Sequence, residues 1–193
     1  MLPPGVRLVI FDADNTLRRT TAAGKPCPHG LDEWELLPGV RETLARLDWA
    51  GGVRLGVASN QDQVAYGHLT LAMARRLLRD MVSAATGRAP VDACIQLCPH
   101  ALEVPCDCRK PAPGMLLRIM ADVGASPAET LFVGDAATDA EAARRAGVAF
   151  TWAADFFGWG ADSRECTQMD DESRGSTRVE QLPGAAADQR GSV

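Results

Sequence analysis

Two carboxylates separated by one residue follow the first apolar run of the chain, within residues 6–17 (VRLVIFDADNTL). The run is rich in β-favouring residues and leads directly into Asp12 and Asp14. A buried strand with this ending carries its acids to the edge of a sheet, where open α/β folds bind ligands. The alternative is a solvated turn after an edge strand, because Asp and Asn are also common turn residues.

Polar side chains also follow three later apolar runs, at residues 54–58, 93–97 and 130–133. They comprise a hydroxyl, an amide, two bases and two further acids: Ser59, Asn60, Arg109, Lys110, Asp135 and Asp139. Because the carboxyl ends of parallel strands share one edge of a sheet, we expect these groups to converge on one crevice. Oxygen ligands beside basic side chains are typical of a site that binds a phosphate with Mg²⁺.

The acids of this set suit phosphoryl transfer. Asp12 and Asp135 are the natural Mg²⁺ ligands, with Asp139 in support, because Mg²⁺ takes few carboxylates and keeps several waters. A carboxylate such as Asp12 can attack phosphorus and form an aspartyl phosphate. Asp14 could then protonate the leaving oxygen and later deprotonate water.

The remaining polar residues are candidates for binding the phosphate and the substrate. Lys110 would neutralise phosphoryl oxygens as a point charge, and Arg109 would offer a bidentate fork to the substrate. Ser59 and Asn60 would donate hydrogen bonds to the same oxygens, and Thr16 is a further candidate donor beside the acids. The alternatives are a solvated basic pair in a loop and, for Ser59, a helix cap.

A second cluster, Cys98-Pro99-His100 followed by Cys106-Asp107-Cys108, has the residue types of a zinc site. In an extended segment, residues i and i+2 point the same way, so two ligand pairs can meet across the short loop. Three thiolates and one imidazole predict a closed, structural Zn²⁺ site over residues 98–108. The alternative is free cysteines or a local disulfide, in which His100 would have no role. A bound zinc would brace the neighbouring Arg109 and Lys110.

The elements that must position these groups alternate along the sequence. Apolar runs of strand length occur at 6–11, 54–58, 93–97, 130–133 and 148–152, and helical patterns occur at 38–49, 64–84, 114–123 and 137–146. This alternation predicts an α/β fold with a parallel sheet flanked by helices. Residues 18–37 have no sustained period, so we expect a flap there. The tripeptide Cys27-Pro28-His29 lies in it without a second ligand pair, and we expect it to be structural or incidental.

The composition limits the class of partner. The chain has 193 residues, a formal net charge of −5 and a pI near 5.2, which argues against a nucleic-acid partner. No apolar run approaches the roughly 18–20 residues of a membrane span, and no signal peptide is recognisable. We therefore expect a cytoplasmic protein, monomeric or weakly oligomeric. One domain is expected over residues 1–160, with a polar, flexible tail over 161–193.

These motifs resemble the haloacid dehalogenase superfamily of phosphohydrolases, through DADNT (12–16), Ser59-Asn60, Lys110 and GDAATD (134–139). The string CPH…CDCRKPAPGM (98–115) is more specifically similar to the heptose bisphosphate and histidinol phosphate phosphatase branch, subfamily IIIA. The resemblance implies a Rossmann-like fold and a Mg²⁺-dependent phosphomonoesterase. It also implies that Asp12 is the nucleophile and that Asp14 is the acid/base and gives the metal its backbone carbonyl. Because there is no large insertion in the flap or between Ser59 and Ala93, we expect the fold to be capless.

Three residues depart from that branch, which commonly has Arg at Ala13, Gly at Asn15 and Lys at Ala136. Asn can replace Gly where the turn is left-handed. Losing an Arg and a Lys removes anion contacts, so the substrate need not be a bisphosphate. The expected substrate is a small phosphorylated metabolite, and a sugar phosphate is the leading candidate. Histidinol phosphate hydrolysis and a zinc-stabilised, non-catalytic binding module stay open as alternatives.

Overall fold

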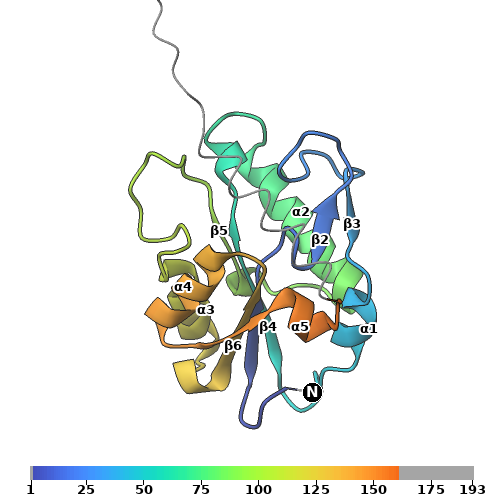
Figure 1. Cartoon of the computed structure of the whole chain (residues 1–193), viewed down its shortest axis with the longest axis vertical. Helices are drawn as coiled ribbons and strands as arrows, with labels where there is room; N and C mark the ends of the chain where they lie inside the picture. The colour runs from blue at the N-terminus through green and yellow to red at the C-terminus, as the bar shows by residue number, and fades with distance from the viewer. Residues whose placement is uncertain (1, 161–193) are drawn as a thin grey trace, which may run out of the picture.

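The computed structural model describes residues 2–160; the predicted tail over 161–193, which includes Cys166, lies outside the described residues. Its centre is a sheet of five parallel strands in the order β5-β4-β1-β6-β7 (Figure 1). The strands are β1 (Leu8–Phe11), β4 (Arg54–Asn60), β5 (Ile95–Cys98), β6 (Thr130–Gly134) and β7 (Ala149–Trp152). The predicted parallel α/β fold is thereby confirmed.

Helices cover both faces of the sheet, with α3 and α4 on one side and α1, α2 and α5 on the other (Figure 1). Their bounds are α1 (Val40–Ala45), α2 (Leu71–Thr86), α3 (Gly114–Val123), α4 (Ala137–Ala146) and α5 (Ala153–Phe157). Short 3₁₀ turns occur at η1 (Asp62–Val64), η2 (Asp92–Cys94) and η3 (Pro127–Glu129). Among the described residues, no helix is long and apolar enough to cross a bilayer.

The central strand β1 explains this three-layer arrangement. Its four apolar side chains are fully buried, and successive side chains point to opposite faces. Leu8 and Ile10 enter the core beneath α3 and α4, whereas Val9 and Phe11 enter the core on the side of α1 and α2. A strand buried on both faces needs a continuous apolar run, which the sequence supplies immediately before Asp12.

The predicted flap over 18–37 contains a small antiparallel hairpin, β2 (Arg18–Thr20) and β3 (Trp34–Leu36). The sequence did not indicate these strands, because β2 has no apolar residue and the alternation in β3 covers only three residues. They form where Trp34 and Leu36 pack against the core on the α2 side, while Arg18 is completely buried.

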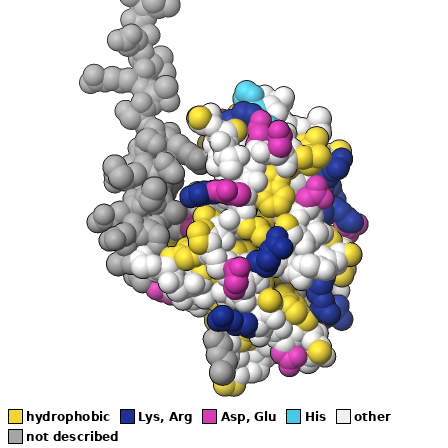
Figure 2. All heavy atoms as spheres, turned by 90° about the vertical axis from the view of Figure 1, so that its right-hand side faces the viewer, with side chains coloured by type: hydrophobic (Ala, Val, Ile, Leu, Met, Phe, Trp, Pro, Cys, Tyr) yellow, Lys and Arg dark blue, Asp and Glu magenta, His cyan; other side chains and the backbone are white. Residues whose placement is uncertain are grey.

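On the face shown in Figure 2, basic and acidic side chains are interspersed with apolar ones.

The predicted bounds of two helices were wrong. The helix expected over 64–84 begins at Leu71, because the Thr70 hydroxyl accepts a hydrogen bond from Met73 N (3.1 Å) and caps it there. The preceding residues form η1 and turns instead, with Gly67 at a φ of 75°. The helix expected over 38–49 is shortened to α1. Between β4 and β5, the described chain consists of α2 with η1, η2 and their turns, so no cap domain is inserted there.

Candidate active site

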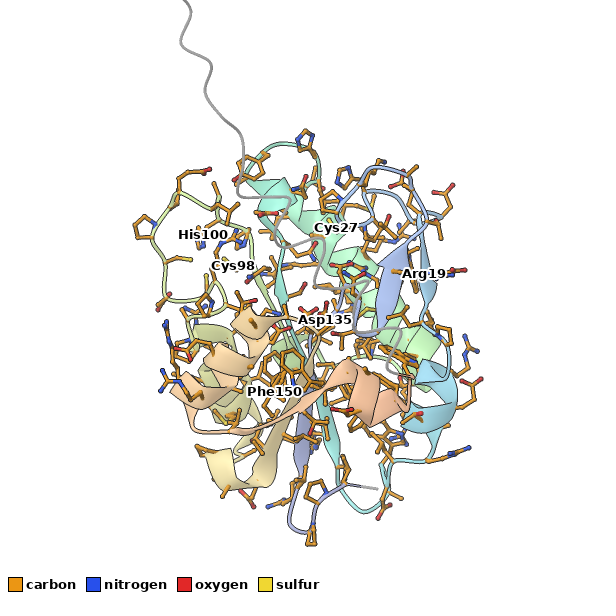
Figure 3. The ribbon with its side chains drawn as sticks, in the orientation of Figure 1. Arg19, Cys27, Cys98, His100, Asp135 and Phe150 are labelled. Carbon is orange, nitrogen blue, oxygen red and sulfur yellow. The ribbon has the colours of Figure 1, made fainter. Side chains whose placement is uncertain are left out.

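The strand ends bring three acids together at the carboxyl edge of the sheet. Asp12 follows β1, Asp135 follows β6, and Asp139 lies in the first turn of α4. Carboxylate oxygens of the three lie within 4.8 Å of one another, and Figure 3 shows Asp135 at the end of the sheet nearest the loops. The sequence predicted this convergence from the order of apolar runs and polar endings.

A glycine at the end of β6 makes room for one of these acids. A Cβ added at Gly134 would lie 2.4 Å from Oδ2 of Asp139, which is closer than real contacts allow. The same oxygen accepts a hydrogen bond from the backbone N–H of Ala136 at 3.1 Å. The backbone around Ala136 therefore fixes the Asp139 carboxylate in orientation.

Lys110 lies between two of the acids. Its Nζ contacts Asp12 Oδ1 and lies 2.7 Å from Asp139 Oδ1, and its side chain is only 3% exposed. Burial alone would lower the pKa of Lys110, but the carboxylates of Asp12 and Asp139 raise it above its usual value. The ammonium therefore stays charged inside the protein.

The backbone of Lys110 is held by the side chain of Asn60, at the end of β4. The Asn60 amide nitrogen donates to the Lys110 carbonyl at 3.1 Å, and its oxygen accepts from the Lys110 N–H at 3.0 Å. Asn60 was predicted to bind phosphate, but both polar atoms of its side-chain amide bond the backbone of Lys110.

Two of the clustered acids, Asp12 and Asp135, hold their protons more tightly than free carboxyls do. Burial raises the pKa of Asp12 well above 3.8, Lys110 opposes this, and the neighbouring Asp139 and Asp135 add to it. Burial, together with Asp139, raises the pKa of Asp135 to about 7. Three carboxylates share one ammonium, so a divalent cation that prefers oxygen ligands would offset the remaining negative charge.

Asp14 points toward a different pair of residues. Its carboxylate accepts from Arg18 Nε at 2.9 Å and from Gln61 Nε2 at 2.9 Å. The chain turns back between Asp14 and Arg18 at Asn15, whose φ of 61° is left-handed, as the Asn-for-Gly replacement suggested. Sequence reasoning missed Arg18 and Gln61; the signals available were an i, i+4 acid–base pair and an amide directly after Ser59-Asn60.

Two predicted phosphate-binding hydroxyls lie inside the protein rather than at an open surface. Thr16 is fully buried, and its hydroxyl donates to Asp135 Oδ1 at 3.1 Å. Ser59 is 1% exposed, and its Oγ accepts from Gln61 Nε2 at 2.9 Å. In this structure both hydroxyls orient neighbouring polar side chains.

Arg109 connects the cysteine loop to η1. Its Nη2 donates to the backbone carbonyl of His100, and its Nη1 lies 3.6 Å from Asp62 Oδ2. Its side chain is 14% exposed, so most of it is covered by the protein.

The predicted cysteine and histidine ligands converge in the loop after β5, where Figure 3 shows Cys98 and His100 side by side. The Cys106 sulfur lies 3.7 Å from that of Cys98 and 3.6 Å from that of Cys108, and His100 Nδ1 lies 3.4 and 3.2 Å from Cys98 and Cys108. Tetrahedral zinc has sulfur–sulfur edges of about 3.8 Å and sulfur–nitrogen edges of about 3.5 Å. The four ligand atoms therefore fit one Zn²⁺ ion.

The backbone around this cluster is adapted to it. The N–H of Arg109 points to Cys106 Sγ at 3.4 Å, a contact that orients and stabilises a thiolate. The start of α3 packs tightly behind the loop, because a Cβ on Gly114 would lie 2.2 Å from the Asp107 carbonyl oxygen.

The profile of the haloacid dehalogenase-like hydrolases matches residues 27–147. The chain belongs to this hydrolase family. It is 41% identical over 117 residues to the D-glycero-β-D-manno-heptose-1,7-bisphosphate 7-phosphatase of Pseudomonas aeruginosa, a match that covers 59% of this chain and 64% of that protein. It is 34% identical over 145 residues to the enzyme of the same name from Pseudomonas putida, covering 74% of this chain and 79% of that one.

A solved structure extends the similarity of this hydrolase to the whole fold. The D,D-heptose 1,7-bisphosphate phosphatase of B. bronchiseptica, complexed with magnesium and phosphate, matches with a TM-score of 0.65 and 27% identity. The match covers 87% of this chain and 99% of that one. The resemblance read from the sequence is confirmed.

The tripeptide Cys27-Pro28-His29 of the hydrolase lies in the connection between β2 and β3. The His29 ring stacks on that of His68 with centroids 5.9 Å apart, and its backbone N–H donates to Glu33 Oε2 at 2.9 Å. Within residues 2–160, the groups of three or more clustered metal-ligand side chains are the acid cluster and the Cys/His cluster, and neither includes this tripeptide.

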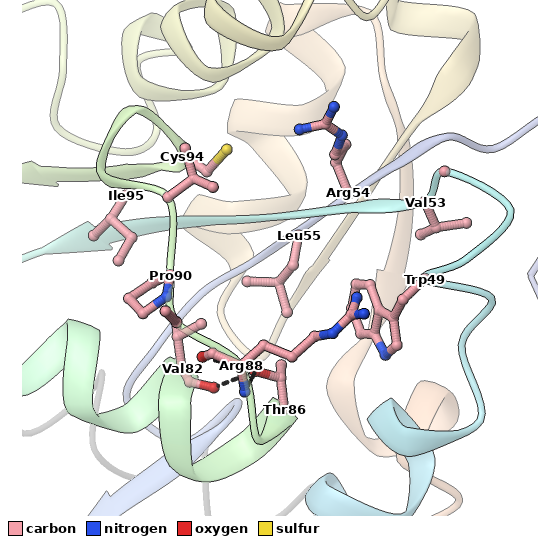
Figure 4. Close-up of a pocket in the computed structure, with 13 residues that line it drawn as sticks. Trp49, Val53, Arg54, Leu55, Val82, Thr86, Arg88, Pro90, Cys94 and Ile95 are labelled. Carbon is pink, nitrogen blue, oxygen red and sulfur yellow. Dashed lines mark hydrogen bonds between the residues drawn. The ribbon is translucent and has the colours of Figure 1, made fainter.

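The hydrolase also has a cleft of about 350 Å³ at the amino ends of β4 and β5, opposite the acids (Figure 4). Its lining is mainly apolar, with Trp49, Leu55, Val82 and Ile95, and two arginines contribute to it. None of the predicted site residues lines this cleft, so it is separate from the candidate active site.

Proposed function

We propose that this hydrolase is a Mg²⁺-dependent phosphomonoesterase that works through an aspartyl phosphate and acts on a small sugar phosphate. The observation that carries the proposal is the placement of Asp12 against the Lys110 ammonium, beside Asp135 and Asp139. The names of the relatives and the magnesium and phosphate in the Bordetella structure support it.

Asp12 is the proposed nucleophile. One carboxylate oxygen attacks the phosphorus of the substrate, the bond from phosphorus to the leaving oxygen breaks, and Asp14 gives that oxygen a proton. Water then attacks the same phosphorus and gives its proton to Asp14, which releases inorganic phosphate and restores the Asp12 carboxylate. Lys110 holds positive charge against the oxygens that become more negative in both steps.

The proposed Mg²⁺ ligands are the carboxylates of Asp12 and Asp135 and the backbone carbonyl of Asp14, with Asp139 in support. Bound there, the ion would polarise phosphoryl oxygens and hold them against the nucleophile. Thr16 fits this arrangement as the residue that orients Asp135. Asn60 and the Cys/His loop fit as the supports of Lys110.

We propose Zn²⁺ as a structural ion bound by Cys98, His100, Cys106 and Cys108. The four ligands leave no coordination position open, which is typical of a structural site. Arg109 and Lys110 follow the last ligand directly, so a rigid loop would fix the basic pair relative to the acids.

Heptose bisphosphate is the first substrate to test, because the relatives carry that name. Ala13 and Ala136 provide no cationic side chain beside the site to bind a second phosphate. Sugar monophosphates are therefore to be tested together with heptose bisphosphate. Phosphate release should be measured with heptose bisphosphate, sugar monophosphates, histidinol phosphate and p-nitrophenyl phosphate, each with and without Mg²⁺. Activity no greater than that of Asp12→Asn on every substrate would refute the proposed function.

A further inference from the structure

Arg18 and Gln61, which have no role in the mechanism proposed above, hold the Asp14 side chain. The guanidinium donates from Nε to Oδ1 at 2.9 Å and from Nη2 to Oδ2 at 3.4 Å. The Gln61 amide donates to the same Oδ2 at 2.9 Å. Both carboxylate oxygens therefore accept hydrogen bonds from protein donors, which hold the Asp14 side chain in one orientation.

Burial makes this arrangement strong. Arg18 is 0% exposed, and in the described part of the chain its ion pair is with Asp14 alone. Its Nη1 is also buried and has no hydrogen-bond partner among the described residues. A buried guanidinium with one counter-ion binds that counter-ion tightly, because leaving the charge unpaired is costly.

The two donors come from separate parts of the fold. Arg18 begins β2, and its backbone carbonyl accepts from Asn15 N at 2.7 Å, which closes the turn that carries Asp14. Gln61 follows β4, is 1% exposed, and donates from the same nitrogen to Ser59 Oγ at 2.9 Å. The position of Asp14 is thus fixed both from the hairpin and from the sheet.

We infer that Arg18 and Gln61 are positioning residues that align Asp14 and set how strongly the rate depends on the leaving group. This inference rests on the proposed phosphatase function. A poor leaving group must take a proton from Asp14 as its bond to phosphorus breaks, whereas p-nitrophenolate leaves without one. Misplacing Asp14 therefore slows the first kind of substrate more than the second.

The test measures kcat/KM for phenyl phosphate and for p-nitrophenyl phosphate. The proteins compared are the full-length wild type and its variants Arg18→Met and Gln61→Met. The ratio kcat/KM reports the steps up to departure of the leaving group. We expect it to fall about tenfold more for phenyl phosphate in both variants, a part of the 10²–10⁴-fold that a general acid contributes. A merely structural defect would lower kcat/KM by the same factor for both substrates.

Arg19→Met is the matched control. Arg19 is the next residue of β2, points away from the sheet in Figure 3, is 58% exposed and pairs with Glu35. It should leave the ratio between the two substrates unchanged. Circular dichroism establishes folding, and Gln61→Met decides the question if Arg18→Met does not fold.

The outcomes separate the two proposals. Wild-type activity no greater than that of Asp12→Asn would refute the phosphatase itself. An active wild type with an unchanged substrate ratio in a folded variant would overturn the inference for that residue and leave the proposed function in place.

Discussion

Replacing Lys110 by Met removes the one ammonium that the clustered acids share. The side chains of Lys110, Asp12 and Asp139 are 3, 10 and 2% exposed, so water cannot replace the lost charge. Breaking a buried pair by removing one partner typically costs about 3–5 kcal/mol. We expect the free energy of unfolding to fall by about that amount near pH 7.5 without Mg²⁺. The loss should be smaller near pH 5.5, where the freed carboxyls bind protons.

Urea unfolding followed by tryptophan fluorescence measures this loss, in magnesium-free buffer without chelator so that the Cys/His loop is undisturbed. Lys25→Met is the matched control, because Lys25 pairs with Glu33 at 2.6 Å while 34% exposed. Such a pair contributes about 1 kcal/mol or less. In the double variant with Asp139→Asn, the loss should be clearly smaller than the sum of the two single losses. A Lys110→Met loss no larger than that of Lys25→Met at both pH values would refute this account of the buried ion pair.

Three further predictions concern the metals and the acid cluster. In Cys106→Ser, bound zinc measured by elemental analysis should fall well below one per chain, and thermal stability and kcat should fall together. The control variant Cys94→Ser changes a cysteine outside the cluster and should keep its zinc. Because Asp135 has a pKa of about 7 in the folded state against 3.8 for a free carboxyl, the metal-free protein should lose stability as pH rises from about 5 to 8. Saturating Mg²⁺ should cancel that loss in thermal unfolding, and a flat pH dependence without Mg²⁺ would contradict it. Gly134→Ala should weaken Mg²⁺ binding measured calorimetrically, because its Cβ would displace Asp139, and unchanged affinity would show that the backbone adjusts.

The sequence predicted the parts of the fold that depend on local pattern. The helices over 114–123 and 137–146 have the bounds predicted for them, because glycines in the left-handed conformation end both, at φ of 69° and 71°. The five strands were predicted because short apolar runs alternate with helical patterns along the sequence. The convergence of Asp12 and Asp135 follows from the parallel sheet, in which β1 and β6 are neighbours.

The features that sequence reasoning missed depend on contacts between distant residues. Arg18 is buried with Asp14 as its counter-ion, and Gln61 donates to the same carboxylate, whereas an arginine is ordinarily expected at the surface. Asn60 pairs with a backbone 50 residues away, which no local pattern reveals. Leu69 continued the helical period but is buried within a turn, so the helix was predicted to begin too early.

The position of β1 at the centre of the sheet has a consequence for how the protein opens. The N–H of Asp12 donates to the Val133 carbonyl at 2.9 Å, so its backbone continues the hydrogen bonding between β1 and β6. Amides in such central strands exchange with solvent only when the whole domain unfolds. The connections around the site, such as residues 21–33 and 63–69, can fluctuate or accept substitutions while Asp12 stays fixed. The chemistry and the contacts that select a substrate can therefore change independently over evolutionary time.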